Sequence, residues 1–332
     1  MIAMTEISTR RPAGTRTKTL KPRDYEYHES VLLAETVKLL AAGPGRTIVD
    51  GTLGGGGHAA ALLAAGARVI GLDQDPEALA FVRERLGDGD ENFRAVRCNF
   101  SAVGEALDAL GIGLIDGALL DLGVSSRQLD SPERGFSFMH DGPLDMRMDP
   151  SAPVSAADLV NTMAGDQMER IFRDFGEEPA ARKIAARLVR DRMVQPFTTT
   201  RQLAEAVESV VPRRGRTHPA TRVFQALRIA VNRELDVLAA GLAEFSKRIA
   251  PGGRFAVISF HSLEDRIVKQ FFKGHTVEFL DRPEWPAPRP NPDFIFKAVT
   301  GKPVVACEAE QRTNPRSRSA KLRVVERISH AG

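Results

Sequence analysis

A glycine-rich segment follows the first short apolar run of the chain and has the composition of a cofactor-binding turn. It reads Asp50-Gly51-Thr52-Leu53-Gly54-Gly55-Gly56-Gly57-His58. Glycines permit positive φ angles and let the backbone approach a ligand where a Cβ atom would clash. Asp73 closes the next apolar run, where a carboxylate can accept hydrogen bonds from both hydroxyls of a ribose. The two features predict a nucleoside cofactor, although the spacing Gly54-x-Gly56-x-x-Ala59 also fits a dinucleotide-binding dehydrogenase.

Two further apolar runs end in residues that could take part in binding or chemistry. One leads into Phe100 and the other into Asp121. Ligands of open α/β sheets lie beyond the carboxyl ends of the strands, so both residues are expected in the same crevice as Asp73. Phe100 either covers the face of an adenine or belongs to the core. Asp121 either caps a loop or accepts a hydrogen bond at the reacting centre.

These residues require a sheet to position them, and the chain has the pattern of one. Short apolar runs alternate with helical periodicity from residue 28, which predicts βαβ units and a parallel sheet. The expected strands are 47–50, 68–72, 93–97, 115–120 and 254–259, with a last pair near 294–299 and 322–326. The expected helices of this part are 30–40 with Ser30 as its cap, 59–65, 76–86, 102–110 and a long helix 222–249.

The alternation stops in the middle of the chain, where amphipathic helices follow a loop. Helices are expected at 168–175, 178–193 and 200–210, with no buried strand among them. We therefore predict a sheet domain formed by residues 27–131 and 219–330. A helical substrate-recognition domain, residues 132–218, is inserted into it, and residues 1–26 form a disordered basic tail.

Composition narrows the class of protein. The 332 residues are 42% hydrophobic and 27% charged, as in an ordinary globular protein. Two cysteines are too few for a disulfide framework or a four-cysteine zinc site, so we expect a cytoplasmic protein without a metal. No apolar run is long enough to cross a membrane. Residues 1–23 hold six bases against one acid, and the remainder holds 40 against 42.

Several long motifs resemble one known family. They are Tyr27-His28-Glu29-Ser30-Val31-Leu32-Leu33, the segment 50–58, Leu119-Leu120-Asp121-Leu122-Gly123-Val124-Ser125-Ser126, Glu133-Arg134-Gly135-Phe136-Ser137-Phe138, residues 141–148, residues 221–226, residues 258–266 and Asn314-Pro315-Arg316-Ser317-Arg318-Ser319. The chain resembles the bacterial 16S rRNA (cytosine-N4)-methyltransferases, the RsmH or MraW family, from residue 27 to residue 328. The basic tail lies outside the resemblance.

The resemblance implies a fold, a cofactor and a reaction. The fold is an α/β Rossmann-like methyltransferase sheet with an inserted helical domain, and the cofactor is S-adenosylmethionine. The methyl group goes to the N4 amino group of a cytidine in the decoding region of 16S rRNA. The implied cofactor-binding residues are Gly55, Gly56, Gly57, His58, Asp73, Phe100, Asp121 and Gln128. For His58 and Gln128, the predicted role in cofactor binding comes from the resemblance alone.

The amino nitrogen of cytosine is a poor nucleophile, because its lone pair is delocalised into the ring. Acceptors on its hydrogens would let it attack the sulfonium methyl group. Asp121, with the backbone carbonyls of Leu122 and Gly123, is the expected acceptor set. His261 either contacts substrate as a further catalytic candidate or is a structural histidine. The Asp/Asn-Pro-Pro-aromatic motif of many amino-methyltransferases is absent, since Leu122, Gly123 and Val124 replace its last three residues.

Arginines supply the candidate contacts with RNA phosphates. The expected set is Arg213, Arg214, Arg216, Arg316 and Arg318, whereas the bases of helix 178–193 fit a solvated helix face. Asp145 and Arg147 are expected to form an internal pair that orders their loop. The implied partner is 16S rRNA in the small ribosomal subunit or its precursor, without a membrane. The sequence allows a homodimer, and the alternative from another class is a ribosome-assembly factor without catalytic activity.

Overall fold

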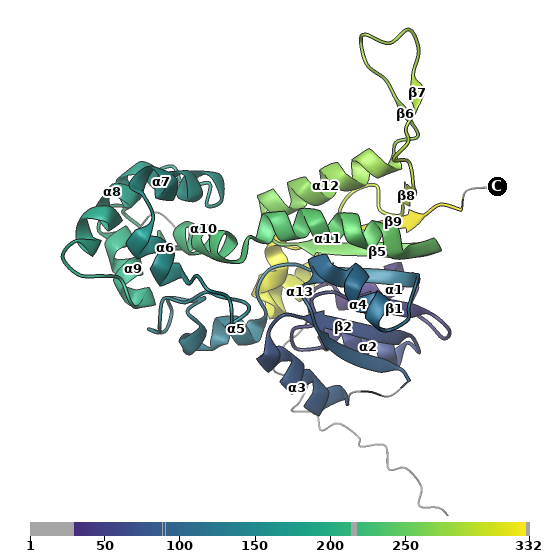
Figure 1. The fold of residues 1–332 in the computed structure, drawn as a ribbon, viewed down its shortest axis with the longest axis horizontal. Coiled ribbons are helices and arrows are strands. Elements are labelled where there is room, and N and C mark those ends of the chain that lie inside the picture. The colour runs from purple at the N-terminus through teal and green to yellow at the C-terminus, as the bar shows by residue number, and fades with distance from the viewer. Residues whose placement is uncertain (1–29, 88, 90, 214–217, 330–332) are drawn as a thin grey trace, which may run out of the picture.

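A seven-stranded sheet forms the centre of the larger part of the molecule in this computed structural model (Figure 1). The structure describes residues 30–87, 89, 91–213 and 218–329. The strand order is β3-β2-β1-β4-β5-β9-β8, in which the first five are parallel and β9 and β8 are antiparallel. The strands are β1 (Thr47–Asp50), β2 (Arg68–Asp73), β3 (Phe93–Arg97), β4 (Ile115–Asp121), β5 (Ile249–Ser259), β8 (Phe296–Ala298) and β9 (Lys321–Arg327). The predicted Rossmann-like fold class is confirmed.

Helices cover both faces of this sheet, which explains why its central strands are almost continuously apolar. The helices of one face are α1 (Leu33–Leu39), α2 (Gly57–Ala64) and α3 (Pro76–Leu86). Those of the other face are α4 (Val103–Ala109), α11 (Glu234–Arg248) and α12 (Ser262–Thr276). The strand order reverses between β1 and β4, and such a switch point is where open α/β sheets bind their ligands.

A separate group of helices lies beside the sheet and has its own apolar core (Figure 1). This helical unit consists of α6 (Ala156–Thr162), α7 (Gly165–Asp174), α8 (Ala181–Arg192), α9 (Thr200–Glu208) and α10 (Thr221–Asn232). Phe172 and Leu188 are fully buried in this core, and Phe224 of α10 belongs to it as well. The packing of the helical unit therefore continues beyond residue 218, where the inserted domain was expected to end.

The single long helix expected at 222–249 is wrong. The chain forms α10 and α11 instead, and Arg233 between them has a left-handed backbone with φ 50°. No glycine or proline marks this break in the sequence, so helical periodicity alone could not locate it. Residue Ile249, expected at the helix end, begins β5. The helix α12, which follows β5, was not predicted.

The beginning of the described chain also differs from expectation. Helix α1 starts at Leu33, and its N-cap is Leu32 rather than Ser30. Leu32 has a left-handed backbone with φ 53°, is fully buried, and donates its N–H to Glu310 Oε1 at 2.7 Å. Contacts from the far end of the chain thus set this helix start. The tail of residues 1–26 lies outside the described residues.

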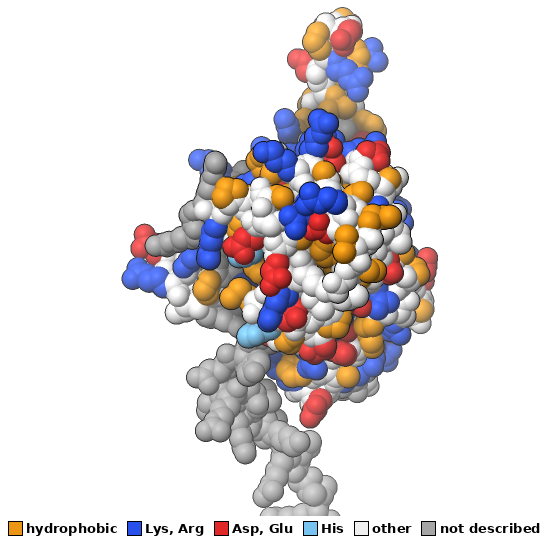
Figure 2. Space-filling view, turned by 90° about the vertical axis from the view of Figure 1, so that its left-hand side faces the viewer, with side chains coloured by type: hydrophobic (Ala, Val, Ile, Leu, Met, Phe, Trp, Pro, Cys, Tyr) orange, Lys and Arg blue, Asp and Glu red, His pale blue; other side chains and the backbone are white. Residues whose placement is uncertain are grey.

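A two-stranded hairpin and two short helices complete the described α-helices and strands. Strands β6 (Phe279–Leu280) and β7 (Arg289–Pro290) form a hairpin that projects from the body (Figures 1 and 2). The short helices α5 (Ser126–Asp130) and α13 (Glu308–Thr313) lie between the sheet and the helical unit in the view of Figure 1. Within the described part of the chain, every helix is too short or too polar to traverse a lipid bilayer.

Candidate active site

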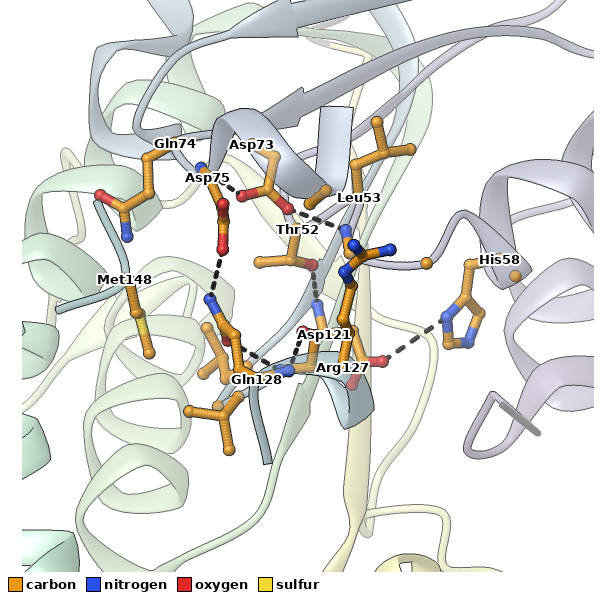
Figure 3. A pocket seen from close by; sticks show the side chains of 18 of the residues that line it. Thr52, Leu53, His58, Asp73, Gln74, Asp75, Asp121, Arg127, Gln128 and Met148 are labelled. Atoms are coloured by element: carbon orange, nitrogen blue, oxygen red, sulfur yellow. Dashed lines mark hydrogen bonds and ion pairs between the residues drawn. The ribbon is translucent and has the colours of Figure 1, made fainter. Parts of the chain in front are cut away.

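The glycine turn after β1 is tied to the end of β2. Gly54 donates its N–H to Asp73 Oδ2 at 2.8 Å, and Leu53 donates its N–H to the carbonyl of Leu72 at 3.0 Å (Figure 3). Gly56 has φ 72°, and a Cβ atom there would lie 3.1 Å from a methyl carbon of Val82. Both conformation and space therefore require glycine at residue 56, where the chain enters α2.

Asp73 lies at the carboxyl end of β2 with both carboxylate oxygens held. Oδ1 accepts the N–H of Asp75 at 2.8 Å, and Oδ2 accepts the N–H of Gly54. Burial raises the pKa of Asp73 to about 6, although these backbone N–H groups stabilise the charged form. Each oxygen of a carboxylate has two lone pairs, so each can accept one more hydrogen bond from a ligand hydroxyl.

A buried polar network connects the β2 end to the loop after α5. Asp75 Oδ2 accepts hydrogen bonds from Gln128 Nε2 at 3.2 Å and from Arg134 Nη1 at 2.6 Å. Gln128 Oε1 also accepts the N–H of Ser125 at 3.0 Å, as part of the capping box of α5. Gln128 is therefore held from both ends of its amide group, with one Nε2 hydrogen left for a ligand. Asp75 and Arg134 were not predicted to be part of the site.

Asp121 ends β4 and faces His58 at the start of α2. Asp121 Oδ2 lies 3.6 Å from His58 Nδ1, while His58 Nε2 lies 3.1 Å from the carbonyl oxygen of Val31 (Figure 3). Burial lowers the pKa of His58 to about 4, so its ring is neutral and donates from Nε2. The unprotonated Nδ1 is then an acceptor pointed at Asp121.

The other carboxylate oxygen of Asp121 is uncommitted. Oδ1 is buried and makes no hydrogen bond to any described residue. Burial raises the pKa of Asp121 well above its ordinary value, and the charges of Asp50 and Glu264 raise it further. An unsatisfied buried acceptor is costly for a folded protein, so its presence indicates a ligand contact. Oδ1 is therefore a buried acceptor that the described residues leave without a partner.

Phe100 lies between the core and the cleft. Its ring is half-buried and lines the cleft described below. On the other side it packs against Gly241 of α11, where a Cβ atom would lie 2.5 Å from the ring carbons. The ring is therefore anchored by the core and still presents an edge or face to a ligand.

These residues line one cleft of about 1580 Å³ at the carboxyl ends of the strands. The glycine turn, Asp73, Phe100, Asp121 and Gln128 all contribute to its wall. Pockets for one small molecule are commonly between about 300 and 1,000 Å³, so this cleft has room for a cofactor and part of a second ligand. The structure thus brings together every described residue that was expected to bind the cofactor, apart from Gly56, which shapes the turn behind it.

Comparison with known proteins decides the family. A model described as the MraW methylase family matches residues 25–328. The chain belongs to the MraW methylase family. It is 51% identical over 308 residues to the ribosomal RNA small subunit methyltransferase H of Geotalea uraniireducens, an alignment that covers 91% of this chain and 99% of the relative. The predicted family is confirmed.

A second relative has the same name, and a solved rRNA methylase shows a looser likeness. The protein of the same name from Anaeromyxobacter dehalogenans is 50% identical over 304 residues, covering 91% of this chain and 98% of its own. A solved rRNA methylase from Streptococcus thermophilus is 12% identical, with a TM-score of 0.42 and coverage of 91% and 98%. That structural overlap is too loose to support a conclusion, whereas the identity to the relatives removes the dehydrogenase alternative.

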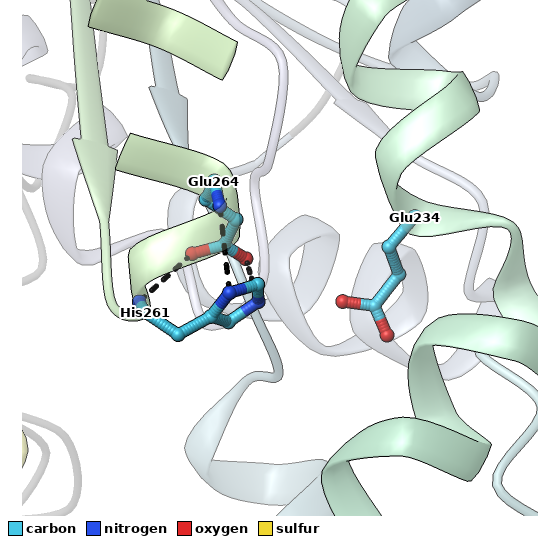
Figure 4. Close-up of side chains that lie close together, drawn as sticks. All are labelled: Glu234, His261 and Glu264. Atoms are coloured by element: carbon cyan, nitrogen blue, oxygen red, sulfur yellow. Dashed lines mark hydrogen bonds and ion pairs between the residues drawn. The ribbon is translucent and has the colours of Figure 1, made fainter. Parts of the chain in front are cut away.

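His261 lies outside the cleft wall, against Glu264. It is the N-cap of α12, where its Nδ1 accepts the N–H of Glu264 at 3.4 Å and its Nε2 lies 3.0 Å from Glu264 Oε1 (Figure 4). Both ring nitrogens therefore face one glutamate. In this member of the MraW methylase family, the geometry favours the structural interpretation of His261 over a contact with substrate.

Glu234 faces His261 and Glu264 across a short gap (Figure 4). One ligand atom of each lies within 4.8 Å of the others, the only such group of three among the described residues. However, Arg228 already binds the carboxylate of Glu234 through two hydrogen bonds of 2.8 Å. Because the arginine neutralises Glu234 and the ring of His261 lies against Glu264, the set is better described as an ion pair beside a histidine–glutamate contact than as a metal site.

The structure describes three of the five expected RNA-binding arginines. Arg213 and Arg318 are exposed, and Arg316 lines the cleft with its Nη2 3.5 Å from Asp130 Oδ1. Arg214 and Arg216 lie outside the described residues. On the face of the helical unit shown in Figure 2, Lys and Arg side chains alternate with Asp and Glu, and Arg187 of α8 pairs with Asp191. A solvated face for α8 is consistent with this arrangement.

The loop before the helical unit is ordered as expected. Arg147 Nη2 lies 2.6 Å from Asp145 Oδ2, and Arg147 Nε donates to Asp145 Oδ1 at 2.9 Å. The predicted internal pair is confirmed. Arg147 also donates to the carbonyl of Ala152 at 2.7 Å, which holds the following turn against the same loop.

Proposed function

We propose that this protein transfers the methyl group of S-adenosylmethionine to the N4 amino group of a cytidine in the decoding region of 16S rRNA. The observation that carries the proposal is Asp121, which lines the same cleft as Asp73 and has a buried carboxylate oxygen, Oδ1, without a hydrogen bond among the described residues. Family membership supplies the reaction class, and the relatives are named for methylation of small-subunit ribosomal RNA.

The cofactor would lie along the carboxyl ends of β2, β1 and β4. Asp73 would accept the ribose hydroxyls, Phe100 would cover the adenine, and the turn from Gly55 to His58 would hold the methionine part. When bound, the cofactor supplies an electrophilic methyl group on a positively charged sulfur. That charge beside Asp121 favours the ionised carboxylate and offsets the effect of burial on its pKa.

Asp121 and two backbone carbonyls would then act on the amino group of the base. Hydrogen bonds from its two N–H groups to Asp121 Oδ1 and to the carbonyl of Leu122 or Gly123 leave the nitrogen lone pair free to attack. Leu122 is fixed by its N–H bond to Ile258 of β5 at 2.9 Å, and Gly123 has φ 98°, a conformation that favours glycine. Acceptors fixed in advance stabilise the positive charge that develops on nitrogen.

The helical unit would bind the RNA that carries this cytidine. Its α10 and the loop residue Met148 contribute to the cleft wall, so RNA held there can place one base in the cleft. The base must be unstacked to reach Asp121, because a paired amino group is not accessible. We propose 16S rRNA within the small ribosomal subunit or its precursor as the partner.

Label transfer tests the reaction directly. The full chain is incubated with small subunits that lack the modification and with methyl-tritiated S-adenosylmethionine, and the RNA is then mapped by mass spectrometry. We expect one N4-methylated cytidine in the decoding region. Binding of the subunits without any transfer of label would instead indicate an assembly factor, and methylation of another atom would overturn the assigned acceptor.

The pKa of Asp73 predicts how cofactor affinity depends on pH. The raised pKa of about 6 means that the carboxylate is ionised above about pH 7 and becomes protonated as the pH falls through 6. A protonated carboxyl accepts ribose hydroxyls poorly, so affinity for S-adenosylhomocysteine should fall about tenfold from pH 7.5 to pH 5. Calorimetry measures this change. The side chain of the variant Asp73→Asn does not titrate, so the affinity of this variant should be the same at both pH values. If the variant kept the tenfold difference of the parent protein, Asp73 would not be the group that causes it.

A salt titration tests the contact of Arg316 with RNA. Each lost phosphate contact lowers the slope of log affinity against log salt by about 0.7 to 0.9. We expect Arg316→Ala to reduce the slope by that amount in an anisotropy assay with a single-stranded RNA of the decoding region. Lys38→Ala is the control, because Lys38 is exposed on α1 and does not line the cleft. Equal slopes in Arg316→Ala and the parent protein would remove Arg316 from the interface.

A further inference from the structure

A buried ion pair in the cleft has no role in the cofactor site described above. Arg228 of α10 and Glu234 of α11 both line the cleft, with side chains only 16% and 10% exposed. Nε of Arg228 donates to Glu234 Oε1 and Nη2 donates to Oε2, each at 2.8 Å. Such a bidentate bond fixes the plane of the guanidinium group.

The break between α10 and α11 makes this pair possible. Six residues of a continuous helix would separate Arg228 and Glu234 by about 9 Å along the axis and turn them to different faces. The left-handed backbone of Arg233 interrupts the helix, and the two side chains meet across this break. Asn232 supports the same junction by donating to the carbonyls of Met146 and Arg228, both at 2.8 Å. A non-glycine residue is thus held in an uncommon conformation where the pair forms.

The remaining nitrogen of Arg228 is available to a ligand. Nη1 makes no hydrogen bond within the part of the chain that the structure describes, whereas Nε and Nη2 are occupied. The nearby carboxylates of Glu234 and Glu264 raise the pKa of Arg228, so the group stays charged. The carboxylates of Glu234 and Glu264 lie within 4.8 Å of one another, and Glu264 accepts the N–H of Phe260. Phe260 follows the end of β5, where Ile258 pairs with Asp121, so the donor and the acceptor lie at the same end of the sheet.

We propose that Arg228 recognises the target base by donating a hydrogen bond from Nη1 to N3 of cytosine. This inference rests on the proposed function and adds the residue that selects the base. The ring nitrogen N3 is next to the carbon that bears the amino group. A base whose amino hydrogens face Asp121 therefore turns its N3 acceptor to the adjoining wall, and Arg228 offers a charged donor there.

The chemistry of the bases explains the selectivity. Cytosine has a donor, the amino group, beside an acceptor, N3, and it needs an acceptor and a donor opposite them. Asp121 supplies the acceptor that faces the amino group, and Arg228 supplies the donor that faces N3. Uracil has a carbonyl at position 4 and an N–H at position 3, so both contacts would be mismatched. A site built around buried polar groups discriminates strongly against such a ligand, because its own groups are left unpaired.

A cycle of two changes tests the contact. Small subunits are reconstituted with either cytidine or 3-deazacytidine at the target position, which replaces N3 by a C–H group. The full-length enzyme and its Arg228→Gln variant are each assayed for kcat/KM with both substrates. A charged hydrogen bond is worth roughly 1.5–3 kcal/mol, so we expect either single change to reduce kcat/KM about 10- to 150-fold.

In Arg228→Gln, the change to 3-deazacytidine should alter kcat/KM only through the intrinsic reactivity of the base, because both changes remove the same hydrogen bond. The variant also reports the intrinsic reactivity of the altered base, which differs from that of cytidine. If the two losses multiply, Arg228 acts elsewhere, for example on a phosphate, and the inference is overturned. Full activity of the parent enzyme on 3-deazacytidine would overturn it without any variant. A parent enzyme that methylates neither substrate would instead refute the proposed function.

Controls separate recognition from folding. The dissociation constant of Arg228→Gln for S-adenosylhomocysteine should match that of the parent protein. Its Tm should fall, because the change leaves the buried carboxylate of Glu234 without its partner, so all assays are run well below the Tm of the variant. The matched control is Arg222→Gln, since Arg222 lies on the same helix, is half exposed and bonds to the carbonyl of Glu177 rather than facing the cleft. It should show the full loss with 3-deazacytidine. Arg228→Lys keeps the positive charge but loses the planar guanidinium group that Glu234 orients. It should show the same loss of kcat/KM as Arg228→Gln, because the contact depends on the orientation of the donor.

Discussion

Replacing Asp121 by asparagine is expected to lower kcat for methyl transfer by about 100- to 1,000-fold. The change removes a charged acceptor from the nitrogen that becomes positive in the transition state, and the loss of one such fixed group has effects of this size. The amide is nearly the same size, so the backbone bond from the Asp121 N–H to Thr52 Oγ1 at 2.6 Å should remain. Affinity for the RNA should change little.

Three measurements separate the possible roles of this carboxylate. Single-turnover label transfer gives the chemical rate, calorimetry with S-adenosylhomocysteine gives cofactor affinity, and anisotropy gives RNA affinity. The demethylated cofactor is preferred because it lacks the sulfonium charge that Asp121 would otherwise bind. A loss confined to cofactor affinity would assign Asp121 to the cofactor alone, and a loss confined to RNA affinity would move it out of the reaction centre.

Asp50→Asn is the matched control for this experiment. Asp50 is a second buried carboxylate, it ends the neighbouring strand β1, and its charge contributes to the raised pKa of Asp121. Burial raises its own pKa to about 7, and its Oδ1 accepts the N–H of Thr52 at 3.2 Å. Asp50 does not line the cleft. If Asp50→Asn slowed the chemical step as much as Asp121→Asn, the effect would reflect loss of any negative charge in the region.

The strand ends show what the sequence could predict. Residues 47–50 and 93–97 form strands with the expected bounds, and Asp73 and Asp121 end β2 and β4. Apolar runs of this length are local signals, and the rule that ligands lie beyond strand ends converts them into a site. The candidate positions for ribose, adenine and reacting group therefore followed without knowledge of long-range contacts.

The second wall of the cleft could not be predicted in this way. Arg228 and Glu234 pair only because Arg233 adopts a left-handed backbone, and arginine carries no preference for that conformation. Arg134 reaches Asp75 over 59 residues of sequence, which no local pattern encodes. One signal was present, however. The spacing of His261 and Glu264 is that of a capping box, which would have indicated the start of α12.

Replacing Asp73 by alanine is expected to weaken cofactor binding by about 10- to 150-fold. This corresponds to roughly 1.5–3 kcal/mol, the contribution of hydrogen bonds to a charged group. Two effects contribute, because the carboxylate faces the cleft and also holds the glycine turn through the N–H of Gly54. Calorimetry with S-adenosylhomocysteine measures the total.

A ligand without one hydroxyl separates the two effects. The 2′-deoxyribose analogue of S-adenosylhomocysteine cannot make one of the expected bonds, so it should bind the parent protein more weakly than the parent ligand. Asp73→Ala should bind both ligands equally, because the acceptor is already gone. If the variant still preferred the ribose form by the original factor, Asp73 would support the turn without touching the sugar. Asp73→Asn keeps one acceptor oxygen for Gly54 or the ribose, and its affinity should therefore fall between the two.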